Sequence, residues 1–272
     1  MSRLWDRPLW AAVPVAVTVL LLAIGAFVPS LAGGVAANQI PVSEAGDAAL
    51  ANPDASGWEE IQAVDVPLAS APSSVPEASD TSVEELSVKA AISESQFFLR
   101  LSWSDATADQ SITDPQAFVD AAAVQLPVNA TTRPQIAMGS TRSPVTVWYW
   151  NPESGAEELV AGGPGSTTLI EDGAVTATAT HSNGRWQLVM SRDLSVGEGR
   201  TTIHPDRDLD VALAVWNGSN LERSGRKSVS EWHSFAMGPG PQGPPFEAIL
   251  WAIAGLAIVA VIVVTALAVR RR

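Results

Sequence analysis

Residues 208–233 read DLDVALAVWNGSNLERSGRKSVSEWH, and this stretch decides how the chain is interpreted. Its first part alternates, with Val211, Leu213 and Val215 on one face and Ala212, Ala214 and Trp216 on the other, which predicts a β-strand. Asn217-Gly218-Ser219 then predicts a turn, and a polar loop leads to Lys227. Only two lysines occur in the chain. Because a buried lysine shifts its pKa readily, Lys227 is a candidate for chemistry, with a solvated loop lysine as the alternative.

Both ends of the chain carry long apolar segments. Leu9–Leu31 contains no charged residue, and Phe246–Val269 contains only Glu247. Each segment is long enough to span a bilayer as a helix. Arg270, Arg271 and Arg272 follow the second span. We therefore expect a protein of the cell membrane, with its C-terminus in the cytoplasm and the middle of the chain on the extracytoplasmic side. A signal peptide cut near residues 35–37 is the alternative for the first span.

These segments divide the chain. We expect an N-terminal transmembrane anchor or signal peptide (1–37), a linker (38–54) and one extracytoplasmic domain (55–237). A Pro/Gly stalk (238–245), a C-terminal transmembrane helix (246–269) and a basic tail (270–272) follow. The middle is long enough to bury a core of its own.

Composition excludes several functions. The net charge of −13 argues against nucleic acid, which needs a basic surface. With no cysteine, the chain cannot form thiolate zinc or cysteine-ligated iron–sulfur sites. The excess of carboxylates, with much Ala and Val, favours adaptation to high salt in a halophile. An ordinary acidic exported domain is the alternative.

The middle of the chain contains many short alternating segments separated by Gly, Asn and Pro turns, and no long amphipathic helix. This pattern is typical of an all-β protein, and we predict a β-sandwich. We expect an entry strand within 57–68, two hairpins around residues 93–95 and 182–184, and single strands at 117–126, 144–150 and 208–216. Residues 69–82 and 152–166 are expected as loops.

Tryptophan is the most conspicuous candidate for binding. Six tryptophans lie on the expected strands or at their ends: Trp103, Trp148, Trp150, Trp186, Trp216 and Trp232. They would suit core packing, stacking on sugar rings, or the walls of a pocket for a flat cofactor, and composition does not separate these three. The three histidines are scattered, and no nucleophile motif or phosphate-binding loop is present.

Five motifs occur in an order that resembles a known family. They are VKAAISESQFFLRLSWSDAT (88–107), FVDAAAVQLP (118–127), PQIAMGSTRSPVTVWYW (134–150), NGRWQLVMSRDL (183–194) and VALAVWNGSNLERSGRKSVSEWH (211–233). Their succession resembles the gamma, cytochrome b type subunits of ethylbenzene dehydrogenase and related respiratory molybdenum oxidoreductases of the dimethyl-sulfoxide reductase type.

The resemblance implies a β-sandwich that holds one haem b between a methionine and a lysine. By motif these are Met138 and Lys227. Candidate residues of the haem pocket are Gly139, Trp103, Trp148, Trp150, Trp216 and Trp232. A lysine binds iron only as the free amine, which burial favours. Protein ligands on both axial positions leave no open site for substrate, which implies a non-catalytic electron-transfer subunit.

The implied partners are the iron–sulfur and molybdopterin subunits of an oxidoreductase that serves anaerobic respiration, and a quinol-oxidising membrane cytochrome as donor. The family's soluble members lack spans like those expected here, so the donor, membrane-bound or soluble, stays open. Nitrate, chlorate and dimethyl sulfoxide are candidate substrates of the complex. The alternatives are a tryptophan-lined carbohydrate-binding module and an anchored surface protein, which the sequons at Asn129 and Asn217 would suit.

Overall fold

The computed structural model describes residues 38–46, 50–237 and 270. The expected spans at 9–31 and 246–269 and the stalk at 238–245 lie outside these residues. Among the residues described, no helix has the length and apolar character needed to cross a membrane. The described residues between 38 and 237 belong to one compact unit.

The domain is built almost wholly from strands, which confirms the expected all-β class. One half of its sheet has the order β10 (Thr176–Ser182), β11 (Arg185–Asp193), β5 (Gln96–Ser104) and β4 (Glu85–Ile92), with β2 (Val64–Pro67) also paired to β4. The other half has the order β12 (Leu209–Trp216), β6 (Ala121–Pro127), β7 (Val145–Asn151), β8 (Gly155–Ala161) and β9 (Thr167–Leu169). Two short strands, β3 (Ala69–Ser70) and β13 (Ser228–Val229), pair with each other beside β12.

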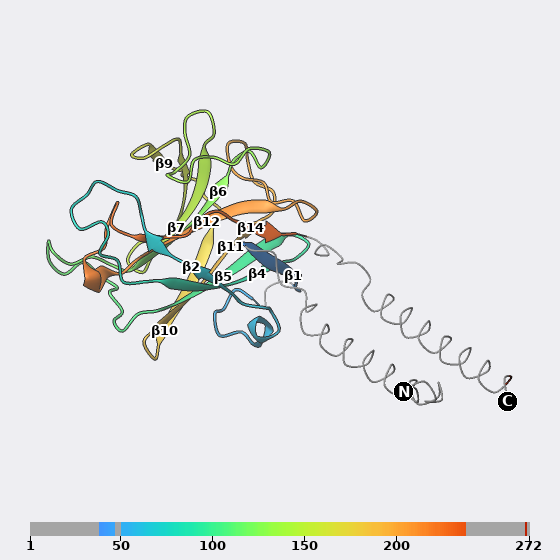
Figure 1. Cartoon of the computed structure of the whole chain (residues 1–272), viewed down its shortest axis with the longest axis horizontal. Coiled ribbons are helices and arrows are strands. Elements are labelled where there is room, and N and C mark those ends of the chain that lie inside the picture. Colours follow the sequence, from blue (N-terminus) through green and yellow to red (C-terminus); the bar gives the residue numbers. More distant parts are fainter. Residues whose placement is uncertain (1–37, 47–49, 238–269, 271–272) are drawn as a thin grey trace, which may run out of the picture. The chain divides into compact units, whose positions relative to one another are not determined.

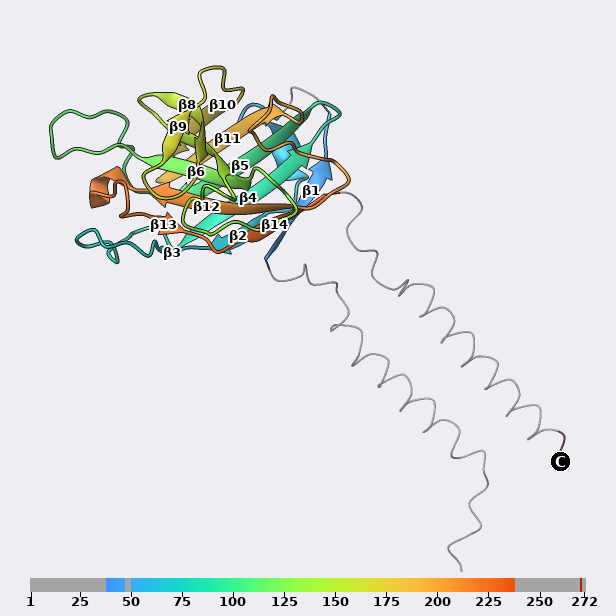
Figure 2. The same cartoon turned by 90° about the horizontal axis from the view of Figure 1, so that it is seen from above.

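The two halves are not separate sheets. Strands β1 (Gln39–Glu44) and β14 (His233–Ala236) run parallel between them, β1 pairing with β4 and β14 pairing with β12. Figures 1 and 2 show these two strands side by side at one edge of the domain. One continuous sheet therefore curls so that its halves face each other, instead of forming two independent layers.

Two hairpins form where the sequence predicts them. β4 and β5 are joined at Ser93, whose N–H donates to the carbonyl of Gln96 at 2.8 Å. β10 and β11 are joined at Asn183-Gly184, where both residues have positive φ (54° and 69°). Such a turn matches the twist of the flanking strands, which explains why an Asn-Gly pair is a reliable hairpin signal.

Several expectations about local structure need correction. The expected loop at 69–82 begins with the short strand β3. The expected linker at 38–54 contributes β1 to the sheet and buries Ile40 and Leu50. The Gly-rich segment at 152–166 contains the strand β8, because Gly155 (φ +81°) completes a tight turn after β7. The entry segment at 57–68 begins with a short 3-10 helix (η3, Ser56–Glu59) and is extended only in β2.

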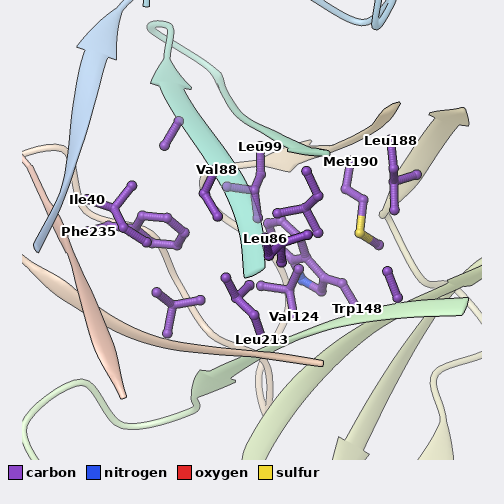
Figure 3. Close-up of a cluster of buried hydrophobic side chains, with 14 of the residues drawn as sticks. Ile40, Leu86, Val88, Leu99, Val124, Trp148, Leu188, Met190, Leu213 and Phe235 are labelled. Atoms are coloured by element: carbon purple, nitrogen blue, oxygen red, sulfur yellow. The ribbon is translucent and has the colours of Figure 1, made fainter. Parts of the chain in front are cut away.

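The core fills the space between the facing halves. Val88 and Leu99 from the first half and Val124, Trp148 and Leu213 from the second all point into it (Figure 3). Aromatic rings from the two halves also meet there, with Phe97 and Trp148 at 6.3 Å between ring centroids and an edge-to-face arrangement. Burial of each large apolar side chain stabilises the fold by about 1.5–3 kcal/mol.

Candidate functional site

A cavity of about 620 Å³ lies on the outer face of the second half of the sheet, away from the core. Its floor is formed by the outward side chains of β6, β7, β8 and β12, which are mostly apolar. The segments 71–73, 136–138, 164–167 and 224–227 contribute its walls. The volume is in the range of pockets that enclose small ligands and cofactors.

Met138 lies in the wall of this cavity, on a tight turn between β6 and β7. The N–H of Met138 donates to the carbonyl of Ile136 at 2.9 Å, and its own carbonyl accepts from Gly163 at 2.9 Å. Met138 has φ +60°, a left-handed conformation that costs a non-glycine residue about 1–2 kcal/mol. Such strain persists only where the surrounding structure holds it, and it is common at ligand-binding sites.

Lys227 lines the same cavity and immediately precedes β13. Its amine lies 4.7 Å from the ring centroid of Trp216, and no carboxylate or hydrogen-bond acceptor among the described residues contacts it. Burial lowers the pKa of Lys227 below its ordinary value. The Trp216 face favours the ammonium form, but an aromatic ring compensates less for lost water than a carboxylate does. The environment of Lys227 therefore makes loss of its proton easier than it would be in water.

The loop before Lys227 is held by buried polar contacts. Glu222 is buried and accepts from the N–H and the hydroxyl of Ser82 at 2.8 and 3.0 Å. Arg226 pairs with Asp80 at 2.9 Å. These contacts connect the loop to the 71–82 segment, whose Ala71 N–H donates to the Lys227 carbonyl at 2.9 Å. The backbone of Lys227 is thus held against the 71–82 segment, and its side chain lines the cavity over the Trp216 ring.

The other expected pocket residues are divided between the two faces of the sheet. Trp216 lines the cavity, and Trp232 packs against the apolar cluster that forms its floor. Gly139 follows Met138 in the same turn, with φ +68°, and a Cβ there would lie 2.5 Å from the carbonyl of Ser143. Met138, Lys227 and Trp216 thus line one cavity, whereas Gly139 and Trp232 lie beside residues that line it.

The remaining three tryptophans are in the core, which corrects their expected role as pocket walls. Trp103, Trp148 and Trp150 are at most 4% exposed and lie between the two halves of the sheet. The reason is the alternation of β7: Trp148 and Trp150 point inward, whereas Val147 and Tyr149 point outward to the cavity. Residue type suggested an aromatic pocket, but strand periodicity decides which face each ring occupies.

Two cavity residues were not anticipated. Gln125 is a polar residue in the apolar run AAAVQLP, and Tyr149 alternates with two tryptophans in VTVWYW. Tyr149 packs edge-to-face against Trp216, with 5.8 Å between ring centroids, and its pKa is raised mainly by burial. A polar residue on a strand that is otherwise apolar on both faces is the signal that would have identified Gln125.

The histidines are not gathered. His181 contacts the carbonyl of Asp105 through Nε2 at 3.0 Å, and His233 contacts that of Glu231 through Nδ1 at 3.1 Å. Within 38–46 and 50–237, no group of three or more His, Asp or Glu side chains is arranged to hold a metal ion. Met138 and Lys227, the two iron ligands expected from the sequence, both line the cavity.

Comparison with known proteins identifies the family. Residues 55–172 and 168–228 match the ethylbenzene dehydrogenase family, so the chain belongs to that family. A Haloferax mediterranei protein assigned as respiratory nitrate reductase heme subunit ORF7 is 55% identical over 96% of this chain and 94% of that protein. Chlorate reductase subunit gamma of Ideonella dechloratans is 32% identical over 69% of this chain and 79% of its own length.

Two further similarities are weaker. Dimethylsulfide dehydrogenase subunit gamma of Rhodovulum sulfidophilum is 34% identical over 60% of this chain and 64% of its own length. Among solved structures, a family 9 carbohydrate-binding module from Caldicellulosiruptor kristjanssonii in complex with glucose gives a TM-score of 0.46 at 8% identity, covering 76% of this chain and 99% of that one. That structural likeness carries no argument about function.

Proposed function

We propose that the protein is a membrane-anchored, extracytoplasmic haem b subunit that transfers electrons and does not itself catalyse substrate turnover. The observation that carries this proposal is that Met138 and Lys227, far apart in the sequence, line one cavity. Because the two residues are far apart in the sequence, they can line one cavity only through the tertiary structure. Membership of the ethylbenzene dehydrogenase family and the printed name of the Haloferax relative, a heme subunit, support the same cofactor.

The residues around the cavity fit a haem. The floor is largely apolar, as a flat macrocycle requires, and Trp216 and Tyr149 offer aromatic edges and faces. Lys227 has no carboxylate partner among the described residues, and burial lowers its pKa, which eases the loss of the proton that binding to iron would require. When bound, the haem supplies a one-electron redox centre. Met138 and Lys227 would hold its iron, a thioether ligand would raise its potential, and two protein ligands would leave no place on the iron for substrate.

The partners follow from the relatives' names and from the chain's two apolar segments. The proposed route passes electrons between a membrane or soluble donor and the iron–sulfur subunit of a respiratory molybdenum oxidoreductase. That complex would reduce nitrate, chlorate, dimethyl sulfoxide or a similar compound. Arg270–Arg272 after the second apolar segment favours a cytoplasmic C-terminus, which puts the domain outside the cytoplasm. The acidic surface agrees with a salt-rich setting.

The test is a reduced-minus-oxidised visible spectrum of the full chain produced with haem available. We expect sharp low-spin b-type bands from the wild type. Met138→Ala and Lys227→Ala should each lose the low-spin signature, because each removes one axial ligand. One matched control is Met190→Leu, in the core. The other is Lys89→Ala, on β4 in the other half of the sheet, where the Lys89 amine donates to the carbonyl of Trp58. A folded wild type without haem, or ligand variants with unchanged spectra, would contradict the proposal.

The alternative hypothesis of a carbohydrate-binding module depends on exposed tryptophans that stack on sugar rings. Trp58, Trp103, Trp148, Trp150 and Trp186 are instead at most 4% exposed. Of the described tryptophans, Trp216 and Trp232 are partly exposed, and Trp216 lines the cavity together with Lys227. A glycan array would be the next experiment only if the folded chain bound no haem.

A further inference from the structure

The floor of the cavity contains one buried amide among apolar neighbours. Gln125 on β6 is 9% exposed and pairs across the sheet with Ala212 on β12 and Val147 on β7, both of which also line the cavity. A polar side chain in such surroundings costs free energy unless it forms a hydrogen bond. Leucine would fill this position without that cost, so the amide needs a partner that repays its burial.

That partner belongs to the methionine turn. The Nε2 amide of Gln125 donates to the carbonyl of Ile136 at 3.1 Å, and the N–H of Met138 donates to the same carbonyl at 2.9 Å. Among the described residues, Gln125 is the only one whose side chain hydrogen-bonds to the segment 135–138. The floor strand is therefore connected directly to the carbonyl around which the turn closes.

The turn is held at its other end by the β8–β9 connection. Gly163 N–H donates to the carbonyl of Met138 at 2.9 Å. Two fixed carbonyls, those of Ile136 and Met138, thus flank a residue in the left-handed region at φ +60°. A strained backbone relaxes when one of its restraints is removed, and a relaxed turn would point its side chain elsewhere.

We propose that Gln125 is a positioning residue that aims the Met138 thioether into the cavity. The use of this orientation, ligation of iron, rests on the proposed haem function. The orientation itself is expected in the haem-free chain as well. Gln125 acts through the Ile136 carbonyl and does not itself serve as a ligand. Binding of iron by Met138 would then depend on the hydrogen bond from Gln125 to the Ile136 carbonyl. Binding of iron by Lys227 would depend instead on the separate loop 217–227.

The experiment compares Gln125→Leu and Gln125→Glu with a matched control, Thr146→Val, in the full chain. Thr146 is buried on β7, and its hydroxyl accepts the N–H of Thr201 at 3.0 Å on the inner side of the sheet. Its loss removes a buried hydrogen bond without touching the methionine turn. The first readout is the Met138 methyl resonance of haem-free protein, which is readily assigned because the chain has four methionines.

We expect the Met138 methyl resonance to shift in Gln125→Leu and to stay at its wild-type position in Thr146→Val. In haem-loaded protein, Gln125→Leu should lose the thioether-to-iron charge-transfer band and lower the midpoint potential, as is also expected of Met138→Ala. The carboxyl group of Gln125→Glu donates to the Ile136 carbonyl only when protonated. Its thioether band should therefore be present at acid pH and be lost at alkaline pH, relative to wild type at the same pH.

Coincident Met138 methyl resonances in Gln125→Leu and wild type would overturn the inference, as would a thioether band that survives Gln125→Leu. The two proposals fail in different ways. A wild-type chain that binds no haem contradicts the proposed function, and the haem-free methyl comparison still decides the role of Gln125. Haem binding with an unmoved Met138 methyl keeps the function and removes the positioning role.

Discussion

The inner and outer faces of β7 carry similarly apolar residues, yet one face is filled and the other is hollow. Inward, Trp150 packs edge-to-face on Trp103 and Trp186, with 6.5 and 5.2 Å between ring centroids. Outward, Val147 and Tyr149 border the cavity. A strand that is apolar on both faces is typical of a strand covered on both sides. The inner face of β7 is therefore covered by the other half of the sheet, whereas its outer face is covered by loop segments that leave a cavity.

The largest effect that separates the two faces is expected from Trp148→Ala. Trp148 is fully buried, meets Phe97, and lies 5.0 Å below the guanidinium of Arg192. Its truncation should lower the free energy of unfolding by about 3–5 kcal/mol, because the core cannot close the space. Val147→Ala, one residue away on the cavity face, is the control and should cost far less. Equal shifts of the urea midpoint, followed by far-UV circular dichroism, would remove the distinction between the faces.

An intermediate effect is expected from Asp120→Asn, just before β6. Asp120 is fully buried and accepts from Trp186 Nε1 at 2.9 Å, Asp109 N–H at 2.8 Å and Gly218 N–H at 2.8 Å. An amide cannot accept from all three donors, so the variant should lose about 1–3 kcal/mol of stability.

The same variant gives a test in pH. Burial, more than any other cause, raises the pKa of Asp120 to about 6, above its ordinary value. The folded state then binds the proton more tightly than the unfolded state, so this group's contribution to stability is present at low pH and is lost as the pH rises through about 6. The deficit of Asp120→Asn relative to wild type should therefore shrink between about pH 4 and pH 7. A deficit that grows over this range would contradict the assignment.

The smallest effect, and one of opposite sign, is expected from Lys227→Met on the outer face. Burial lowers the pKa of Lys227, so the folded state binds a proton less tightly than the unfolded state, and wild-type stability rises with pH up to the unfolded pKa near 10.4. Removal of the amine should stabilise the haem-free chain at pH 7 by of order 1 kcal/mol. Lys89→Met, which loses the hydrogen bond to Trp58, should not stabilise it. Thermal unfolding of the haem-free proteins measures both.

The hairpins were predictable because their signals are local. Asn183-Gly184 encodes its own turn, and the alternation of residues 96–104 and 185–193 specifies their shared face. β1 was not predictable, because it is only six residues long and contains Pro41, and because its hydrogen-bonded neighbours, β4 and β14, lie far along the chain. Composition describes segments, whereas parallel pairing between distant segments is a property of the whole fold.

The site was predictable only in part, for a related reason. Rarity and motif order indicated Met138 and Lys227, and the structure brings both to one cavity. Trp103, Trp148 and Trp150 were assigned to the pocket by residue type, although alternation directs them into the core. The sequence of β6 could have marked Gln125 as unusual, since it is polar among apolar residues, but its partner, the Ile136 carbonyl, lies in the next loop and only the fold reveals it.

The pairing of β1 with β14 also sets the order of assembly. Gln39, near the start of the domain, pairs with Ser234, near its end. A chain that is still being synthesised can form both hairpins early, but it cannot close its sheet until β14 has been made. Contacts between such distant segments form slowly, since a long loop must be closed first. β1 is therefore without its partner β14 until nearly the whole domain has been synthesised, and the sheet can close only in a domain that is complete.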